Sequence, residues 1–158
     1  MYKKILVPID GSETSNRALE TAVELAKTFG ADLRLAHVIE QAAYLTGYDP
    51  MGGYTGNLVD IMRESGAKLL SEAVARAQAA GVAADSVIFD SLGERLAETV
   101  ARAAREWGAE LIVLGTHGRR GVGRMLMGSG AEQIIRLAPV PVLVVRSEGQ
   151  PKPEAAGL

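Results

Sequence analysis

Short apolar runs alternate with longer amphipathic stretches along most of the chain, and this alternation constrains the fold more than any other feature. We expect strands at about 4–9, 33–39, 87–89, 111–114 and 142–145, and helices at about 12–29, 58–80, 94–107 and 131–137. Strict alternation of strand and helix is typical of a parallel sheet with right-handed crossovers and helices on both faces. We therefore predict an α/β fold built on a single doubly wound five-stranded parallel sheet, in the order 3-2-1-4-5.

The composition fits this fold. The 158 residues are 47% hydrophobic but only 4% aromatic, as expected when aliphatic helices pack on a parallel sheet. The length corresponds to one domain, which we place at residues 1–147, followed by a flexible tail at 148–158. The stretch 41–56 contains four glycines and three tyrosines and is long for a connection. It is either a lid over a ligand or a surface for a partner or a second subunit.

Charge and composition argue against several classes of partner. The net charge is −2 and the chain has no cysteine, so nothing indicates nucleic-acid binding, a disulfide scaffold or a thiolate metal site. No apolar run approaches the ~20 residues that span a bilayer, and the N-terminus lacks the apolar core of a signal peptide. We expect a cytoplasmic protein with neither a membrane nor a nucleic acid as its partner.

A glycine pattern follows the expected strand at 111–114. This strand runs into Gly115-Thr-His-Gly118, and Gly128-Ser129 follows after nine further residues, where a helical pattern begins. Glycines between a buried strand and a helix let backbone N–H groups converge on an anion, and the helix N-terminus adds partial positive charge. The spacing is neither a Walker A loop nor a dinucleotide fingerprint. We interpret it as a phosphate site, with a glycine-rich surface loop as the alternative.

The predicted strand order brings two such segments together. The first strand ends in Asp10-Gly11-Ser12 and the fourth in Gly115-Thr116. In doubly wound sheets the ligand lies beyond the carboxyl ends of the strands, where the strand order reverses. In the order 3-2-1-4-5 this point falls between the first and fourth strands, so both segments face one crevice.

Several motifs together resemble the universal stress protein family, in its ATP-binding branch. They are the N-terminal Met1-Tyr-Lys-Lys-Ile-Leu-Val-Pro-Ile-Asp10, then Leu35-Ala-His-Val38, then the segment 109–118, then Leu126-Met-Gly-Ser129, and last Pro139-Val-Pro-Val-Leu-Val-Val145. The resemblance covers about residues 2–146. It implies a domain that binds ATP, with Mg²⁺ or Mn²⁺ carried by the nucleotide. It also implies a homodimer formed through the last strand, from Val140 to Val145.

The resemblance assigns each part of the nucleotide to a segment. Adenosine would lie beside Pro8 and Asp10, the backbone of Val38 would meet adenine, and Leu114 and Gly115 would line the ribose. The phosphates would be wrapped by the glycines, arginines and small residues of the two loops, namely Gly118, Arg119, Arg120, Gly128, Ser129, Gly130 and Ala131. No residue is assigned as a metal ligand.

The chain departs from the family pattern at two of these positions. After Gly128-Ser129 the family commonly has a β-branched residue and then a Ser or Thr, whereas this chain has Gly130 and Ala131. We expect Gly130 to add backbone freedom there. Ala131 offers no hydroxyl, and a charge-assisted hydrogen bond is worth ~1.5–3 kcal/mol, so ATP affinity is expected to be reduced but not lost.

Some residues have a structural interpretation beside the functional one. Asp10 is either a ligand contact or a helix cap. We interpret His37 as a satisfied structural histidine of the sheet, and His117 as a loop residue and not a base or metal ligand. The arginines around Gly121 are either phosphate contacts or a solvated face.

We also weighed other functions. A phospho-acceptor domain using Asp10 and Asp90 is disfavoured, because the third strand would lie at the sheet edge, away from the first. A slow ATP-hydrolysing enzyme lacks a convincing base beyond Asp10, and a nucleotide-free dimeric interaction module leaves the glycine spacing unexplained. We therefore predict an ATP-binding stress-response or regulatory protein. Its nucleotide would act as a conformational ligand with at most slow hydrolysis, and no residue is assigned as catalytic.

Overall fold

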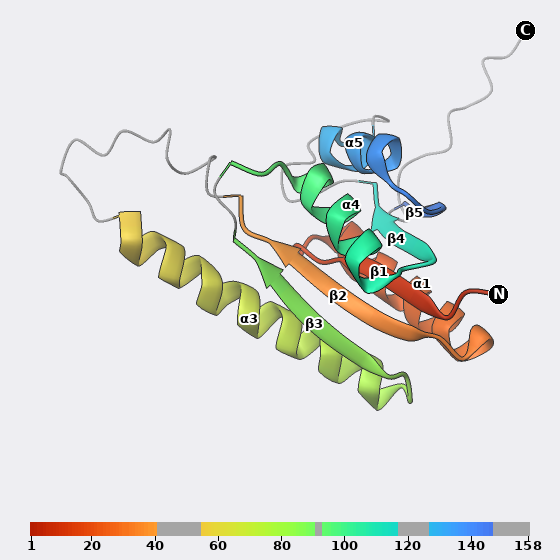
Figure 1. Ribbon diagram of the computed structural model, residues 1–158. Coiled ribbons are helices and arrows are strands. Elements are labelled where there is room, and N and C mark those ends of the chain that lie inside the picture. The colour runs from red at the N-terminus through yellow and green to blue at the C-terminus, as the bar shows by residue number, and fades with distance from the viewer. Residues whose placement is uncertain (41–54, 91–92, 117–126, 147–158) are drawn as a thin grey trace, which may run out of the picture.

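A computed structural model describes residues 1–40, 55–90, 93–116 and 127–146 (Figure 1). Strands and helices alternate through these residues as predicted, with boundaries within three residues or so of those expected from the sequence. The elements are β1 (Lys4–Pro8), α1 (Glu13–Phe29), β2 (Asp32–Val38), α3 (Thr55–Ala79), β3 (Ala84–Phe89), α4 (Leu96–Trp107), β4 (Leu111–Gly115), α5 (Ser129–Leu137) and β5 (Val142–Val145).

The sheet has the predicted topology. All four strand pairs are parallel, and the order is β3-β2-β1-β4-β5. The chain therefore leaves β1 toward one side of the sheet and later crosses back to place β4 on the other side of β1. This reversal sets the carboxyl ends of β1 and β4 next to each other.

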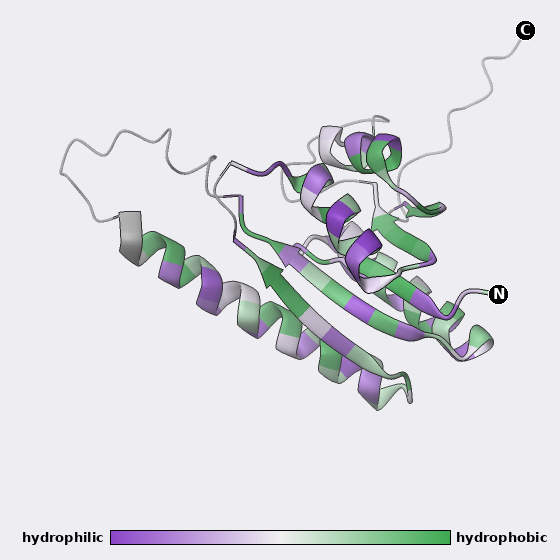
Figure 2. Ribbon diagram, viewed as in Figure 1, coloured by the Kyte–Doolittle hydropathy of each residue, from purple (hydrophilic) through white to green (hydrophobic). Residues whose placement is uncertain are grey.

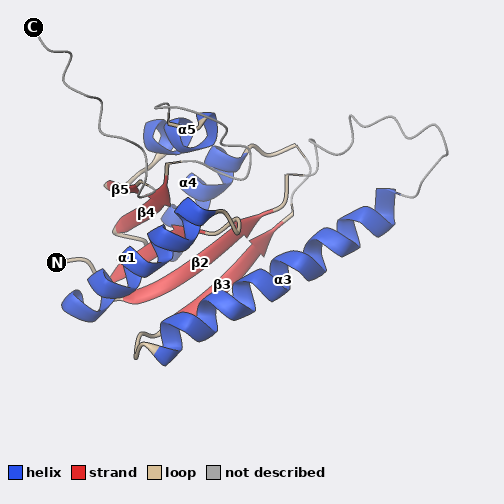
Figure 3. Ribbon diagram, turned by 180° about the vertical axis from the view of Figure 1, so that it is seen from behind, coloured by secondary structure: helices blue, strands red, loops and turns tan. Residues whose placement is uncertain are grey.

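Helices cover both faces of the sheet. Seen from behind, α1 and α3 lie across one face (Figure 3), and α4 and α5 lie on the other. Along β1, Ile5 and Val7 are buried against α1 and α3, while Leu6 is buried against α4 and α5. Burial on both faces explains why this strand is continuously apolar instead of alternating. Figure 2 shows the same apolar character in β4, whereas β2 is interrupted by polar residues.

Helix α3 reaches farther than the sheet it covers. Its first turns project past the carboxyl end of β3 (Figure 1), and Leu58 and Ile61 in these turns are exposed. These turns of α3 thereby form a wall beside the carboxyl ends of the strands. None of the helices in the described residues is long and apolar enough to cross a membrane.

Candidate functional site

A crevice of about 500 Å³ opens at the carboxyl ends of the strands, at the predicted switch point. It is bounded by the ends of β1, β2 and β4, by the start of α5 and by the first half of α3. All nine of the predicted site residues that the structure describes line this crevice: Pro8, Asp10, Val38, Leu114, Gly115, Gly128, Ser129, Gly130 and Ala131. The fold thus brings together segments that are far apart in the sequence.

The turn after β1 uses its polar groups to begin α1. Gly11 has φ of 81°, a left-handed conformation that favours glycine. Asp10 Oδ1 accepts a hydrogen bond from the N–H of Ser12 at 2.9 Å, and Ser12 Oγ accepts one from the N–H of Ser15 at 3.2 Å. Ser12 is therefore the N-cap of α1, and Asp10 supports the turn before it. Asp10 also lines the crevice, so its structural role leaves it at the site.

The end of β4 lies very close to the start of α1. A Cβ atom placed on Gly115 would lie 2.6 Å from the carbonyl carbon of Thr14 and 2.7 Å from Thr14 Oγ1. Real Cβ atoms do not approach a backbone so closely. Gly115 is thus required by the contact between β4 and α1, a packing reason that the sequence analysis did not give.

The start of α5 is built differently from that of α1. Its N-cap is Gly128, which has φ of −57° and makes no side-chain capping bond. The N–H of Gly128 donates to the carbonyl of Thr116 at 2.8 Å, which ties α5 to the end of β4. Among the described residues, no group accepts from the N–H of Ser129, Gly130 or Ala131. A helix leaves such first-turn N–H groups without partners inside the helix, and here they lie at the crevice.

The two positions that depart from the family pattern are packed. Gly130 is helical, and a Cβ there would lie 3.2 Å from Leu96 Cδ2 on α4. The backbone freedom expected at this glycine stays a prediction, and the structure adds a packing reason for it, since Gly130 lets α5 lie close to α4. Ala131 is 7% exposed and belongs to the core cluster that contains Ile134. Ala131 also lines the crevice.

The other wall of the crevice is formed by residues that the sequence analysis did not assign to the site. These are on β2 and α3: His37, Ile61, Met62, Ser65, Gly66 and Leu69. The α3 residues recur at helical spacing and form one stripe, which is also the pattern of an ordinary core-facing helix. Periodicity alone therefore could not separate a ligand wall from a core face.

His37 is satisfied, as predicted for a structural histidine. Its Nδ1 lies 2.7 Å from the carbonyl oxygen of Ile9. The ring also lines the crevice, which the sequence analysis did not foresee. One signal was available in the sequence, namely Gly66, a glycine inside a long helix where it costs about 1 kcal/mol relative to alanine.

Charge in the described part of the crevice is acidic. Asp10 and Glu40 are the only Asp, Glu, Lys or Arg side chains among its described lining residues. Gly118, Arg119 and Arg120, predicted to contact phosphates, lie outside the described residues, as do His117, the tyrosine-containing segment 41–54 and the tail 148–158. The positive potential that the described residues offer an anion thus comes from the N-terminus of α5.

Other polar groups near this edge of the sheet are engaged elsewhere. Asp90 follows β3 at the far edge of the sheet and pairs with Arg63 of α3, so it does not join Asp10. Arg102 donates to Glu94 at 2.8 Å, and this hydrogen bond lowers the pKa of the Glu94 carboxyl. In the described ranges, no group of three His, Cys, Asp or Glu residues is arranged to hold a metal ion.

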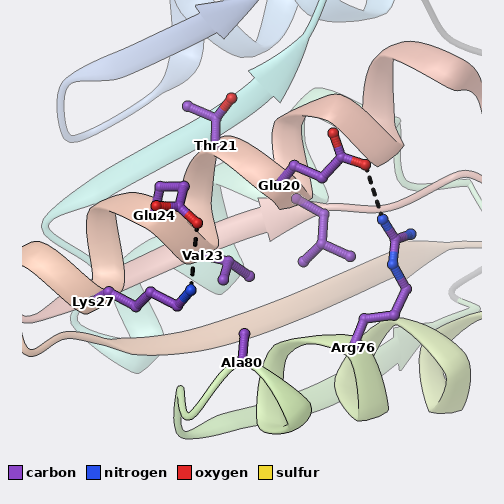
Figure 4. A pocket seen from close by; sticks show the side chains of 8 residues that line it. Glu20, Thr21, Val23, Glu24, Lys27, Arg76 and Ala80 are labelled. Atoms are coloured by element: carbon purple, nitrogen blue, oxygen red, sulfur yellow. Dashed lines mark hydrogen bonds and ion pairs between the residues drawn. The ribbon is translucent and has the colours of Figure 1, made fainter.

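A second hollow lies between α1 and α3, on the opposite face from α5 (Figure 4). It measures about 380 Å³ and has an aliphatic floor that includes Val23 and Ala80. Its rim carries ion pairs, from Arg76 to Glu20 at 3.1 Å and from Lys27 to Glu24 at 3.4 Å. The hollow sits toward the C-terminal halves of the two helices, away from the strand ends, and brings no chemically distinctive groups together.

Known proteins are similar to this chain in both sequence and fold. The Universal stress protein family matches residues 1–146. Universal stress protein YxiE of Bacillus subtilis is 36% identical over 152 residues, which cover 92% of this chain and all of that protein. A universal stress protein family structure from Burkholderia pseudomallei is 38% identical, with a TM-score of 0.75 and coverage of 92% of this chain and 97% of that one.

A third relative was solved with a ligand. It is a universal stress protein in complex with cAMP, 25% identical to this chain, with a TM-score of 0.65 and coverage of 91% of this chain and 97% of that one. The family match spans every described helix and strand, and the sheet order is the one predicted from the sequence. The chain belongs to the universal stress protein family.

Proposed function

We propose that the crevice binds an adenine nucleotide, with ATP as the expected ligand, and that the nucleotide acts as a conformational ligand in a stress-response or regulatory protein. The observation that carries the proposal is the uncapped N-terminus of α5. The N–H groups of Ser129, Gly130 and Ala131 have no acceptor among the described residues, and the crevice opens onto them. Free N–H groups at a helix N-terminus are a site for a phosphate.

The shape of the crevice supports the same ligand. Beyond α5 it continues between the ends of β1 and β2 toward the apolar side chains of α3. A nucleotide needs a polar end for its phosphates and an apolar slot for its base, and the crevice offers these at its two ends. The relative solved with cAMP holds a ligand of the same chemical class.

The described residues fit a metal that arrives with the nucleotide. No acidic group of three stands ready among the described residues to hold a cation alone, whereas Mg²⁺ is commonly held by substrate phosphates together with one or two carboxylates and waters. In the described part of the crevice, Asp10 and Glu40 would supply carboxylate oxygens and Ser129 a hydroxyl oxygen for such a metal. The metal would screen the phosphate charge, and the residues themselves would bind and orient the nucleotide.

We expect binding without efficient hydrolysis. The carboxylate of Asp10 accepts from the N–H of Ser12, and His37 Nδ1 is bonded to Ile9. Each group thus already has a hydrogen-bonding role within the fold. Phosphoryl transfer requires a positioned nucleophile and charge stabilisation of the transition state, so we expect slow hydrolysis at most.

Two measurements test the proposal. Denaturing the purified protein and separating the supernatant by chromatography should release an adenine nucleotide. Calorimetry on nucleotide-free protein should show ATP binding that Gly128→Val abolishes, because the added side chain blocks approach to the N–H groups of α5. A chain that releases no nucleotide and binds no ATP would instead be a nucleotide-free interaction module.

We further propose a homodimer formed through β5. This strand lies at the edge of the sheet, where unpaired backbone groups favour association unless they are covered. Leu143 is 38% exposed on it, and pairing with a two-fold copy would cover both features. Leu143→Lys should shift sedimentation toward the monomer while the chain stays folded, and a wild-type monomer at micromolar concentration would refute the dimer.

A further inference from the structure

The hydrogen-bond ladder between β1 and β2 ends one bond earlier than a regular parallel ladder would. The last register pair is Pro8 with Ala36, and the N–H of Ile9 then donates to the carbonyl of Ala36 at 2.8 Å. In a parallel ladder the next bond would run from the N–H of Val38 to the carbonyl of Ile9. Within the described residues this bond is not made.

A side chain takes the place of the missing donor. His37 Nδ1 lies 2.7 Å from the carbonyl oxygen of Ile9. A carbonyl oxygen only accepts hydrogen bonds, so Nδ1 must carry the proton, and Nε2 of the neutral ring keeps its lone pair. The imidazole thereby makes the hydrogen bond to this carbonyl that the N–H of Val38 would make in a regular ladder.

The backbone of Val38 is directed at the crevice as a result. Along a parallel strand, successive residues turn their N–H and C=O groups to opposite sides. Ala36 bonds to the β1 side, and the N–H of Ile39 bonds to Phe89 on the β3 side at 2.8 Å. Val38, two residues after Ala36, therefore turns its N–H and C=O toward β1, where the chain has already left the sheet and the crevice begins.

Helix α3 leaves space for the His37 ring at Gly66. A Cβ on Gly66 would lie 2.6 Å from His37 Cδ2 and 3.1 Å from His37 Nε2. Moving the ring away from such a Cβ would break its hydrogen bond to the carbonyl of Ile9. A glycine in the middle of α3, unfavourable for the helix itself, is explained by this contact.

We propose that His37 is a positioning residue of the crevice. By holding the carbonyl of Ile9, it keeps the N–H and C=O of Val38 free as a donor and acceptor pair. Such a pair matches the edge of adenine, where N1 accepts and the 6-amino group donates. It is mismatched to guanine, where N1–H donates and O6 accepts. The selectivity for adenine rests on the proposed function, whereas the displaced strand pairing does not.

The first test needs no nucleotide. Long-range ¹H–¹⁵N NMR of the ligand-free protein, with the imidazole neutral, should show His37 protonated on Nδ1. The amide of Val38 should exchange with solvent faster than the amide of Ile39, which is bonded to Phe89. In His37→Leu the Val38 amide should become protected as it closes on Ile9, and in His37→Asn it should stay exposed, because the asparagine amide places an N–H near the position of Nδ1. A proton on Nε2, or equal protection of both amides in the wild type, would overturn the proposal.

The second test compares ATP, GTP and inorganic triphosphate by calorimetry. His37→Leu should weaken ATP by about tenfold, the scale of one lost hydrogen bond, and bring its affinity to that of GTP. Inorganic triphosphate, which lacks a base, should bind as it does to the wild type. His37→Asn should recover most of the preference for ATP. An unchanged ratio of ATP to GTP affinity in His37→Leu would overturn the role of His37.

Gly66→Ala supplies a matched control on α3. The added methyl should displace the ring and reproduce the loss seen in His37→Leu. In the double variant His37→Asn with Gly66→Ala, the smaller side chain leaves space and selectivity should return. If the wild type binds none of the three ligands, the proposed function fails, while the tautomer and the exchange of Val38 still decide whether His37 displaces the strand pairing.

Discussion

The N-termini of α1 and α5 border the same crevice, but the chain finishes them in opposite ways. Helix α1 begins with Ser12 as a side-chain cap, supported by the carboxylate of Asp10. Helix α5 begins at Gly128 with no side-chain cap. A capped terminus beside a carboxylate has little to offer an anion, whereas an uncapped one presents unpartnered N–H groups. Under the proposed function, the difference predicts that phosphate binds at the start of α5 and that sugar or base binds at the other end of the crevice.

The same difference explains the choice of small residues. At α1 the close approach is made by Gly115 of β4, which contacts the helix backbone and positions it. At α5 the small residues are within the helix itself, where Gly130 packs on Leu96 and Ala131 on the core. The contact of Gly115 fixes the wall of the crevice at α1. The small residues of α5 let the start of that helix pack closely without side chains that would cover its N–H groups.

A side-chain cap on the N-terminus of α5, like the one on α1, should cause the largest loss of ATP affinity. Gly128→Asp adds a capping carboxylate at a backbone conformation that any residue adopts. It should satisfy the first-turn N–H groups and repel phosphate, weakening ATP by about a hundredfold or more. Gly128→Asn, which caps without charge, should weaken ATP less. Calorimetry showing wild-type affinity for Gly128→Asp would place the phosphates elsewhere.

Disturbing the wall beside α1 should chiefly reduce stability. Gly115→Ala forces a methyl group into the backbone of Thr14, and overpacking of this kind costs about 1–3 kcal/mol in free energy of unfolding. Urea denaturation measures this loss. Gly66→Ala serves as the comparison and should lose less free energy of unfolding. Its methyl group meets the side chain of His37 instead of a backbone, and alanine has a higher helix propensity than glycine. Equal stability of Gly115→Ala and the wild type would contradict the close contact.

Removing the cap of α1 should cost stability without affecting the phosphate end. Ser12→Ala deletes the hydroxyl that accepts from Ser15, and an N-cap of this type is worth about 1 kcal/mol. Chemical denaturation should show this loss, and the affinity for inorganic triphosphate should stay as in the wild type. A large loss of triphosphate binding would mean that the two termini share the phosphates.

The smallest change is a hydroxyl added at α5. Ala131→Thr restores a donor beside the first turn and should tighten ATP by up to about 1 kcal/mol, with little change for adenosine. Because Ala131 is 7% exposed, the extra atoms also press on the core, and part of this gain is expected to be lost. Equal shifts for the two ligands would show that position 131 does not contact the phosphates.

The fold was largely predictable, because burial on both faces leaves continuous apolar strands such as β1 and allows few connections between them. The ends of β1 and β4 and the start of α5 were also predictable, since glycine and small polar residues are concentrated there. The packing of Gly115 on Thr14 and of Gly130 on Leu96 was not predictable, because it depends on how the elements approach each other. The α3 wall was not, because Ile61 and Leu69 have the spacing of an ordinary core face. His37 was correctly interpreted as satisfied, but its partner, the carbonyl of Ile9, depends on where strand pairing stops, and side-chain patterns do not encode that.

The measurement closest to the central claim is an NMR titration of the ligand-free protein with ATP, followed at the backbone amides of both helix starts. The amides of Ser129, Gly130 and Ala131 should show the largest changes, and those of Thr14 and Ser15 in α1 should move little. Inorganic triphosphate should reproduce the changes at α5. Large changes confined to α1, with α5 unaffected, would contradict the assignment of the phosphates to the uncapped helix.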